Sequence, residues 1–372
     1  MTKIFCGEPW KQIFIGPDSK PKTCCSGRTP LGDLQNENIQ DIINGPILKE
    51  IKTSILNNEW HANCMLCKEL EEKGIESQRK RTEHDLLNGE TYFENLDFHI
   101  PEMIDIRWDN TCNLACNYCM PYFSSVWASL KNEYQKSPRN NDGVIQYLKE
   151  NANSIKHGIL LGGEPFLQKK NLELIEIISD NTTLHFVTNL SFGPLENNHL
   201  FQKLLEKKNH ISFSVSFETI GEKFEYVRHG AKWDVFLSNL KILKEKFMVT
   251  AMPLYCCYSA FNLMEYYDFI NEHNLHVKWQ KIEGPIELNV SLLPMELRAK
   301  AVDEIKAVVT KYKNTPHMDI ETLMNLRESL YVKQKNDISV AMVKDFHIDL
   351  ERKYHKKSRT FLDLWEIFKD EV

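Results

Sequence analysis

Three closely spaced cysteines decide the fold, in the stretch Cys112-Asn113-Leu114-Ala115-Cys116-Asn117-Tyr118-Cys119. This stretch follows a predicted strand at residues 103–108. Three thiolates at this spacing can hold one face of a cubane iron–sulfur cluster, which takes four ligands. One iron is then open to a ligand from outside the protein, and an open metal position is typical of a reactive centre. Zinc is the alternative, but structural zinc favours paired C-x2-C knuckles and four protein ligands.

Outward from this loop, the chain alternates between short apolar runs and helical patterns. The predicted strands are residues 103–108, 158–161, 184–188, 211–217, 249–254 and 277–281. The predicted helices lie near residues 122–134, 143–152, 170–180, 197–207, 232–246 and 262–273. Six consecutive β/α units predict an α/β fold with a parallel sheet and helices outside it. We expect an open, partial (β/α)6 barrel over residues 100–290, and a C-terminal helical extension over residues 291–372.

Polar motifs stand where the predicted strands end. Gly162-Gly163-Glu164-Pro165 follows the second strand, Thr188-Asn189 ends the third, and Ser216-Phe217-Glu218 ends the fourth, with Arg228 twelve residues after Ser216. Glycine lets the backbone come close to a ligand, and arginine suits a bidentate contact with a carboxylate. Because functional loops gather at the carboxyl ends of parallel strands, these motifs predict one ligand-binding edge.

Together, the cysteine loop and these motifs resemble the radical S-adenosylmethionine (SAM) superfamily over residues 100–290. The resemblance implies that Cys112, Cys116 and Cys119 bind a 4Fe–4S cluster whose open iron is chelated by SAM. Reductive cleavage of SAM then gives a 5′-deoxyadenosyl radical, which takes a hydrogen atom from substrate.

The same resemblance implies roles for the motif residues. Gly162, Gly163, Glu164 and Pro165 correspond to a GGEP motif that receives the ammonium group of SAM, and Asn189 belongs to a frequent Thr-Asn pair. Ser216 and Arg228 correspond to residues that hold the SAM carboxylate, while Glu218 faces the ribose or the substrate. Tyr118 matches an aromatic position near the adenine, although a packing role explains it equally well.

A second group of cysteines precedes the predicted barrel, at Cys6, Cys24-Cys25, Cys64 and Cys67. Residues 11–15 and 21–24 predict a hairpin, and Gly45-Pro46 divides a helical pattern over residues 39–56. The layout of residues 1–85 resembles the SPASM or twitch module, which carries an auxiliary 4Fe–4S cluster, here placed N-terminal to the barrel. Spacing alone does not choose between Cys24 and Cys25, although Cys24 is slightly favoured. A zinc site and free thiols are the alternatives.

Bulk properties exclude some classes of protein. The chain has 372 residues and a formal net charge of −6, so no basic excess indicates nucleic-acid binding. No apolar run approaches 18 residues and the N-terminus lacks a signal-peptide core, so we expect a cytoplasmic protein without a membrane span. In a reducing compartment its ten cysteines favour metal ligands or free thiols over disulfides. Cys256-Cys257 is expected to be a pair of buried thiols, with a hydrogen-donor role as the alternative.

The leading hypothesis is a two-cluster radical SAM oxidoreductase that modifies a peptide side chain, with the auxiliary cluster as electron acceptor. The same chemistry on a small molecule such as a sugar alcohol is the alternative, and a non-enzymatic metal-binding scaffold is a remote one. The resemblance also implies an external electron donor such as flavodoxin or ferredoxin. The substrate class rests on family analogy only.

Overall fold

The structure is a computed structural model that describes residues 4–72, 76–80, 91–133, 141–282, 284–315, 318–331, 338–354 and 359–369. The chain divides into two compact units, each described by itself. Unit 1 comprises Met1–Cys112, Tyr134–Val187 and Asn197–Ile211, and unit 2 comprises Asn113–Glu133, Thr188–Glu196 and Ser212–Val372.

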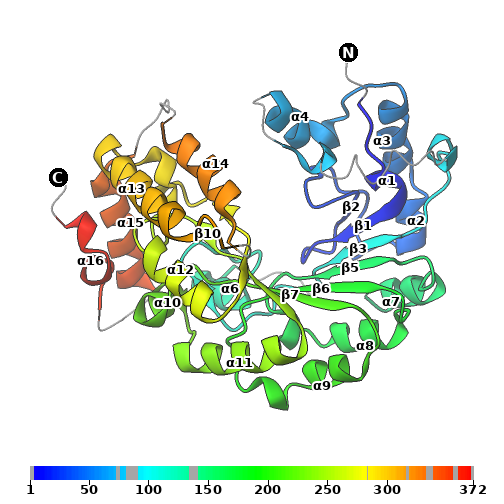
Figure 1. Cartoon of the computed structure of the whole chain (residues 1–372). Coiled ribbons are helices and arrows are strands. Elements are labelled where there is room, and N and C mark those ends of the chain that lie inside the picture. Colours follow the sequence, from blue (N-terminus) through cyan, green and yellow to red (C-terminus); the bar gives the residue numbers. More distant parts are fainter. Residues whose placement is uncertain are drawn as a thin grey trace. The chain divides into compact units, whose positions relative to one another are not determined.

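Unit 1 is built on strands in the order β2-β1-β3-β5-β6 (Figure 1). Their bounds are β1 (Gln12–Ile15), β2 (Pro21–Lys22), β3 (Met103–Ile106), β5 (His157–Leu160) and β6 (Thr183–Thr188). The predicted hairpin is present, since β1 pairs antiparallel with β2. However, β1 also pairs in parallel with β3, from Gln12 opposite Met103 to Ile15 opposite Ile106. The N-terminal segment therefore extends the sheet, and all four residues of β1 are buried, as in strands covered on both faces.

Most helices of unit 1 begin and end close to the predicted positions, although no helix was predicted at residues 8–11. The helices are α1 (Glu8–Lys11), α2 (Ile39–Ile43), α3 (Pro46–Leu56), α4 (Met65–Glu72), α7 (Asn141–Glu150), α8 (Lys170–Ile177) and α9 (His199–Glu206). Gly45 is the N-cap of α3 and Pro46 its first residue, so this pair separates α2 from α3 as predicted. The segment of residues 86–100 that precedes β3 lies partly outside the described residues, and residues 91–94 form a short 3-10 helix.

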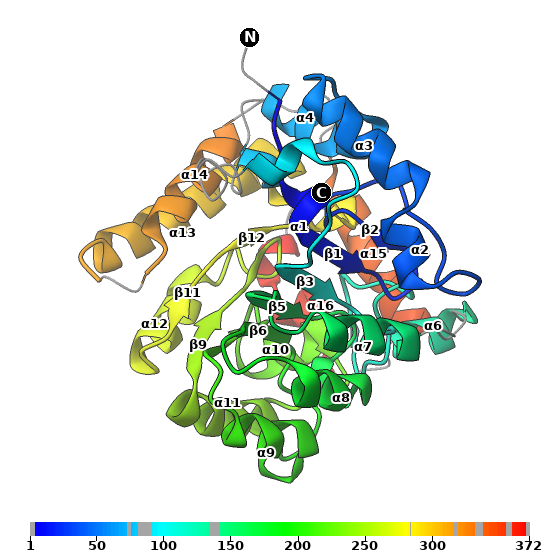
Figure 2. The same cartoon turned by 90° about the vertical axis from the view of Figure 1, so that its right-hand side faces the viewer.

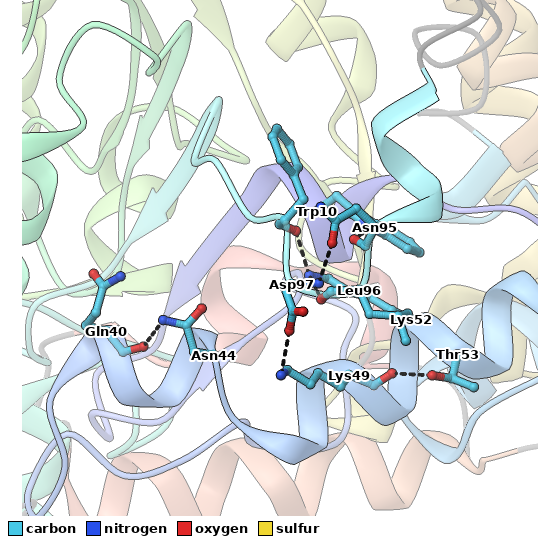
Figure 3. Close-up of polar contacts among 10 residues, drawn as sticks. Trp10, Gln40, Asn44, Lys49, Lys52, Thr53, Asn95, Leu96 and Asp97 are labelled. Atoms are coloured by element: carbon cyan, nitrogen blue, oxygen red, sulfur yellow. Dashed lines mark hydrogen bonds and ion pairs between the residues drawn. The ribbon is translucent and has the colours of Figure 1, made fainter.

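Figure 3 shows how the segment before β3 is fixed on the N-terminal helices. The indole Nε1 of Trp10 donates to the carbonyl of Asn95 (3.0 Å), and Lys49 in α3 forms an ion pair with Asp97. Lys52, also in α3, is buried and donates to the carbonyl oxygens of Leu96 (3.0 Å) and Phe98 (2.7 Å). Burial lowers the pKa of Lys52 to about 8. This buried amine therefore holds the chain where it enters β3.

Unit 2 contains the remaining strands. β7 (Ile211–Val215), β9 (Met248–Ala251) and β11 (His276–Val277) pair in parallel, as do β10 (Leu254–Tyr255) and β12 (Gln280–Lys281). Each of the last two predicted strands is thus divided in two. The first division falls at Pro253, which has no N–H for a ladder, so only its carbonyl is used, as acceptor for the Gln280 N–H (2.9 Å).

The helices of unit 2 fall into two groups. The first comprises α6 (Ser125–Lys131), α10 (Gly221–Val227), α11 (Trp233–Lys246) and α12 (Leu263–Glu272). The C-terminal group comprises α13 (Met295–Tyr312), α14 (Ile320–Tyr331), α15 (Val340–Lys353) and α16 (Phe361–Leu364), and Figures 1 and 2 both show α13 and α14 side by side.

The predicted fold class is confirmed. The strands are mostly parallel, helices follow them along the chain, and no closed barrel forms within the described residues. The described part of the chain after Pro294 contains helices and no strand, as expected. Among the described helices, none combines the length and the apolar composition needed to cross a membrane.

Candidate active site and auxiliary cluster site

The second cysteine of the loop is held in a two-stranded pair in unit 2. β4 (Ala115–Cys116) pairs antiparallel with β8 (Arg228–His229), which places Cys116 opposite Arg228. The carbonyl of Cys116 accepts the indole Nε1–H of Trp127 and the N–H of Cys119, both at 2.9 Å. Cys116 is buried and Cys119 is half-buried, so two thiols of the loop lie on a fixed backbone.

Burial changes the protonation of these two thiols. It raises the pKa of Cys116, an effect that Arg228 partly offsets, and it raises the pKa of Cys119 to about 12. Both groups are therefore neutral thiols unless a metal cation takes the place of the protons, as a metal does when it binds cysteine.

The GGEP turn in unit 1 lies directly against the residue before Cys112. The N–H of Glu164 donates to the carbonyl of Thr111 (2.8 Å), and a Cβ on Gly163 would lie 2.2 Å from that oxygen. Gly163 also has φ +56°, in the left-handed region. Only glycine fits both demands, so the motif fixes the start of the cysteine loop.

The carboxylate of Glu164 is buried and partly engaged. Its Oε1 accepts the N–H of Phe166 (3.2 Å), which caps the short helix Pro165–Leu167. Behind the turn, the amide of Gln168 donates to the carbonyl of Asp109 (2.8 Å) and that of Gly162 (2.7 Å). The backbone of the motif is thus fixed by side chains that the sequence analysis did not single out.

Asn189 in unit 2 contacts the cysteine loop. Its Nδ2 donates to Oδ1 of Asn113 (3.1 Å), and Nδ2 of Asn113 donates to the carbonyl of Ser191 (2.7 Å). The N–H of half-buried Ser216 donates to the carbonyl of Thr188 (3.0 Å), so the Thr-Asn and Ser-x-Glu motifs lie side by side. Asn113 was missed by the sequence analysis, although its place beside Cys112 was a usable signal.

Arg228 and Glu218 form a bidentate ion pair in the interior of unit 2. Nε lies 3.1 Å from Oε2 and Nη2 lies 2.6 Å from Oε1, and the side chains are 4% and 1% exposed. Nη1 of Arg228 lies 4.0 Å from Sγ of Cys116, and the guanidinium stands 5.6 Å from the ring centre of Tyr118. Four predicted site residues are therefore brought together, and the fork of Arg228 is directed at a carboxylate of the protein itself.

The N-terminal cysteines surround one cavity in unit 1. Cys6, Cys24, Cys64 and Cys67 line this cavity, whereas Cys25 does not and is exposed. Buried Asn63 joins the two halves of the lining, because its amide donates to Oγ1 of Thr23 (2.8 Å) and accepts from the N–H of Thr29 (3.1 Å). The structure thus separates two adjacent cysteines that spacing leaves equivalent.

The charged segment after Cys67 closes one wall of the same cavity. Arg79 lines it and binds Glu71 through two nitrogens, Nε at 2.9 Å and Nη2 at 2.6 Å. Its third nitrogen, Nη1, donates to the carbonyl of Phe5 (3.1 Å), beside Cys6. This charged segment therefore supports the first cysteine of the group.

Family models match both regions of the chain. The model of the radical SAM superfamily matches residues 108–259, and that of SPASM, an iron–sulfur cluster-binding domain, matches residues 6–68. The chain carries a radical SAM domain and an N-terminal SPASM domain. The predicted family and the predicted order of its domains are confirmed, and the cofactors of this radical SAM enzyme are SAM, a SAM-binding 4Fe–4S cluster and an auxiliary cluster.

Individual relatives match part of the chain. A 7-carboxy-7-deazaguanine synthase of Clostridium acetobutylicum is 29% identical over 177 residues, which are 47% of this chain and 69% of that protein. Native anSMEcpe with bound AdoMet matches with a TM-score of 0.46 and 14% identity, over 58% of this chain and 63% of that chain. Streptococcus suis SuiB matches with a TM-score of 0.43 and 14% identity, over 73% and 63%. The matches thus span less than two thirds of these two structures.

The donor set of the SPASM cavity fits an iron–sulfur cluster. Four cysteines line this cavity, and cysteine thiolates are the ligands that a 4Fe–4S cluster takes from a protein.

Iron content tests which of two adjacent cysteines binds the auxiliary cluster. The reconstituted protein is expected to hold about eight irons, as two 4Fe–4S clusters, and Cys24→Ala to hold about four. Cys25→Ala is the matched control and should keep about eight, because its thiol lies outside the cavity. Iron and zinc are measured by elemental analysis after anaerobic reconstitution. Loss of iron in Cys25→Ala but not in Cys24→Ala, or zinc in place of the second cluster, would contradict this assignment.

Cys256 and Cys257 are fully buried in unit 2, as predicted for packing thiols. The N–H of Cys257 donates to the carbonyl of Leu288 (2.9 Å), and burial raises the pKa of Cys256 to about 12. Trp279 is also a core residue, since its indole Nε1 donates to the hydroxyl of Tyr267 (2.8 Å). These residues therefore belong to the packed core of unit 2.

Proposed function

We propose that this radical SAM enzyme oxidises a peptide side chain, with the auxiliary cluster of its SPASM domain as electron acceptor. The observation that carries the proposal is the difference between its two cysteine sets. The loop offers three cysteines, whereas four cysteines line the N-terminal cavity. Three ligands leave one iron for SAM, and four close the second cluster, which suits electron transfer rather than substrate ligation.

The proposed cluster ligands form two sets. Cys112, Cys116 and Cys119 would bind the SAM-cleaving cluster, and Cys6, Cys24, Cys64 and Cys67 the auxiliary one. When bound, the first cluster and SAM supply a 5′-deoxyadenosyl radical that takes a hydrogen atom from substrate. The auxiliary cluster would supply an acceptor for one electron, and with one proton released to solvent the product would have lost two hydrogens.

The turn Gly162–Pro165, Asn189, Ser216 and Tyr118 are the proposed contacts of SAM. The glycines permit a close approach of the backbone, and Glu164 and Ser216 offer acceptor and donor groups for the ammonium and the carboxylate. Glu218 and Arg228 are paired with each other, so they are not among these proposed contacts. The domain boundaries that we propose are residues 1–85, 100–290 and 291–372.

A small-molecule substrate is the second candidate. The similarity to 7-carboxy-7-deazaguanine synthase favours it, since that protein is named for a small heterocyclic product. The proposal of a peptide substrate rests on the resemblance to SPASM-type proteins. The chemistry of the site, rather than the fold, decides between a peptide and a small molecule. In either case we propose an external one-electron donor of the flavodoxin or ferredoxin type.

Product formation tests the proposed function. Reduced protein carrying both clusters is expected to form 5′-deoxyadenosine slowly from SAM alone, because solvent or reductant quenches the radical. A peptide encoded beside this gene should accelerate formation of 5′-deoxyadenosine at least tenfold, measured by chromatography. The peptide itself should become lighter by two hydrogens, measured by mass spectrometry. Acceleration only by small metabolites would transfer the proposal to the second candidate. No 5′-deoxyadenosine under any of these conditions would refute both.

A further inference from the structure

Arg228 divides its hydrogen-bond donors between two partners of different kinds. Nε and Nη2 face the two carboxylate oxygens of Glu218, at 3.1 and 2.6 Å, which is the fork geometry of a strong arginine–carboxylate pair. The remaining terminal nitrogen, Nη1, lies 4.0 Å from Sγ of Cys116. A guanidinium held by two bonds cannot rotate freely, so its third edge stays directed at the cysteine.

The backbone enforces the same arrangement. Cys116 and Arg228 stand opposite each other in the β4–β8 pair, and the hydrogen bond from Trp127 to its carbonyl fixes the backbone of Cys116. The ring of Tyr118 lies 5.6 Å from the guanidinium and covers it. Arg228 and Glu218 are 4% and 1% exposed, so water scarcely competes for these donors.

We propose that Arg228 is a positioning residue of the SAM-binding cluster: Glu218 holds its guanidinium, which donates to the Cys116 thiolate and favours the reduced cluster. Hydrogen bonds to ligand sulfurs and nearby charge are known levers on cluster potentials. Reduction adds one negative charge, and the Arg228–Glu218 pair directs its positive end, Nη1 of Arg228, at the ligand sulfur, so the pair stabilises that charge. The inference rests on the proposed function, since it requires a cluster at the cysteine loop.

This role differs from a contact with the SAM carboxylate, which the sequence resemblance implies for Arg228. Glu218 occupies the Nε–Nη2 edge of the guanidinium, so a bidentate contact with SAM cannot use that edge while the pair is intact. The two roles also predict different measurements. A SAM ligand changes the affinity for SAM and leaves the potential of the SAM-free cluster unchanged, whereas a cluster-positioning residue changes that potential without SAM.

The experiment is an electron paramagnetic resonance redox titration of the full-length protein with both clusters loaded. The main variant is Arg228→Met with Glu218→Gln, because replacing both partners avoids an unpaired buried charge. The measured cluster is the one whose signal responds to SAM. At the midpoint potential of the wild type, the ratio of oxidised to reduced cluster in this variant should be at least tenfold higher. This corresponds to a midpoint potential lower by about 59 mV for one electron. Arg228→Lys keeps the charge without the fork and should shift the ratio less.

Two controls confine the effect to this pair. The auxiliary cluster in the same sample should keep its potential, because neither substituted residue lines its cavity. Arg359→Gln removes a cation from the exposed pair with Glu222 in unit 2 and should change neither cluster. If the double variant does not assemble its clusters, Arg228→Lys carries the test alone.

The opposite results are equally definite. An unchanged potential with at least tenfold weaker SAM binding would assign Arg228 to the SAM carboxylate. An unchanged potential with unchanged SAM binding would make the pair a structural ion pair only, and either result overturns the inference. The potential is measured without turnover, so absence of 5′-deoxyadenosine in the wild type would refute the proposed function separately.

Discussion

Cys116→Ala is expected to abolish formation of 5′-deoxyadenosine, with a loss of at least about 1000-fold relative to the wild type, as expected when the reactive metal centre is lost. The reason is that Cys116 is the central thiol of the loop, is buried, and has no neighbouring cysteine that could replace it in β4. The variant should still hold about four irons in the N-terminal cavity. Chromatography of the reduced reaction mixture and iron analysis are the measurements.

The matched control is Cys257→Ala, a second fully buried cysteine of unit 2 outside the loop. Its loss leaves a small cavity that costs about 1 kcal/mol, but it should keep about eight irons and form 5′-deoxyadenosine. Cys256→Ala would separate packing from hydrogen donation, since a hydrogen donor would lose product while SAM cleavage continues. Cleavage of SAM by Cys116→Ala at the wild-type rate would exclude the cysteine loop as the reactive centre.

The architecture could be predicted from the sequence because strands that are covered on both faces appear in it as apolar runs. Residues 103–106, 157–160 and 211–215 became β3, β5 and β7 within two residues of the predicted bounds. The parallel pairing of β1 with β3 was missed, because a hairpin pattern specifies its own two strands and not the partner beyond them. The separation of β9 from β10 was missed although Pro253 marked it.

The site was predictable to the level of motifs and no further. Spacing placed Cys24 and Cys25 in the same group, but only burial and the cavity lining distinguish them. Glu218 and Arg228 were both predicted as site residues, yet their mutual pairing depends on helix α10, which returns the chain so that Arg228 faces Cys116. Such pairings arise from tertiary geometry, and ten residues of separation in the sequence do not encode them.

Gly163→Ala is expected to lower 5′-deoxyadenosine formation by roughly 100-fold, as small displacements of reacting groups commonly do. The new Cβ would stand 2.2 Å from the carbonyl oxygen of Thr111. Rotating a side chain relieves nothing here, because the obstructing atom is backbone, so Thr111 must move and carry Cys112 with it. The substitution lowers the folding stability in two ways: overpacking costs about 1–3 kcal/mol, and the left-handed φ costs about 1–2 kcal/mol for alanine.

Gly221→Ala separates these two costs, since Gly221 has nearly the same dihedral angle, φ +58°, but nothing within 4 Å of its added Cβ. It should carry the dihedral cost alone and keep its SAM-cleavage rate within a few-fold of the wild type. The measurements are the melting temperature, iron content and 5′-deoxyadenosine rate of both variants, assembled in parallel. Equal losses in the two variants would mean that backbone strain alone is responsible. The close contact between the GGEP turn and Thr111 would then have no part in holding Cys112, and the glycine would be required only for its conformation.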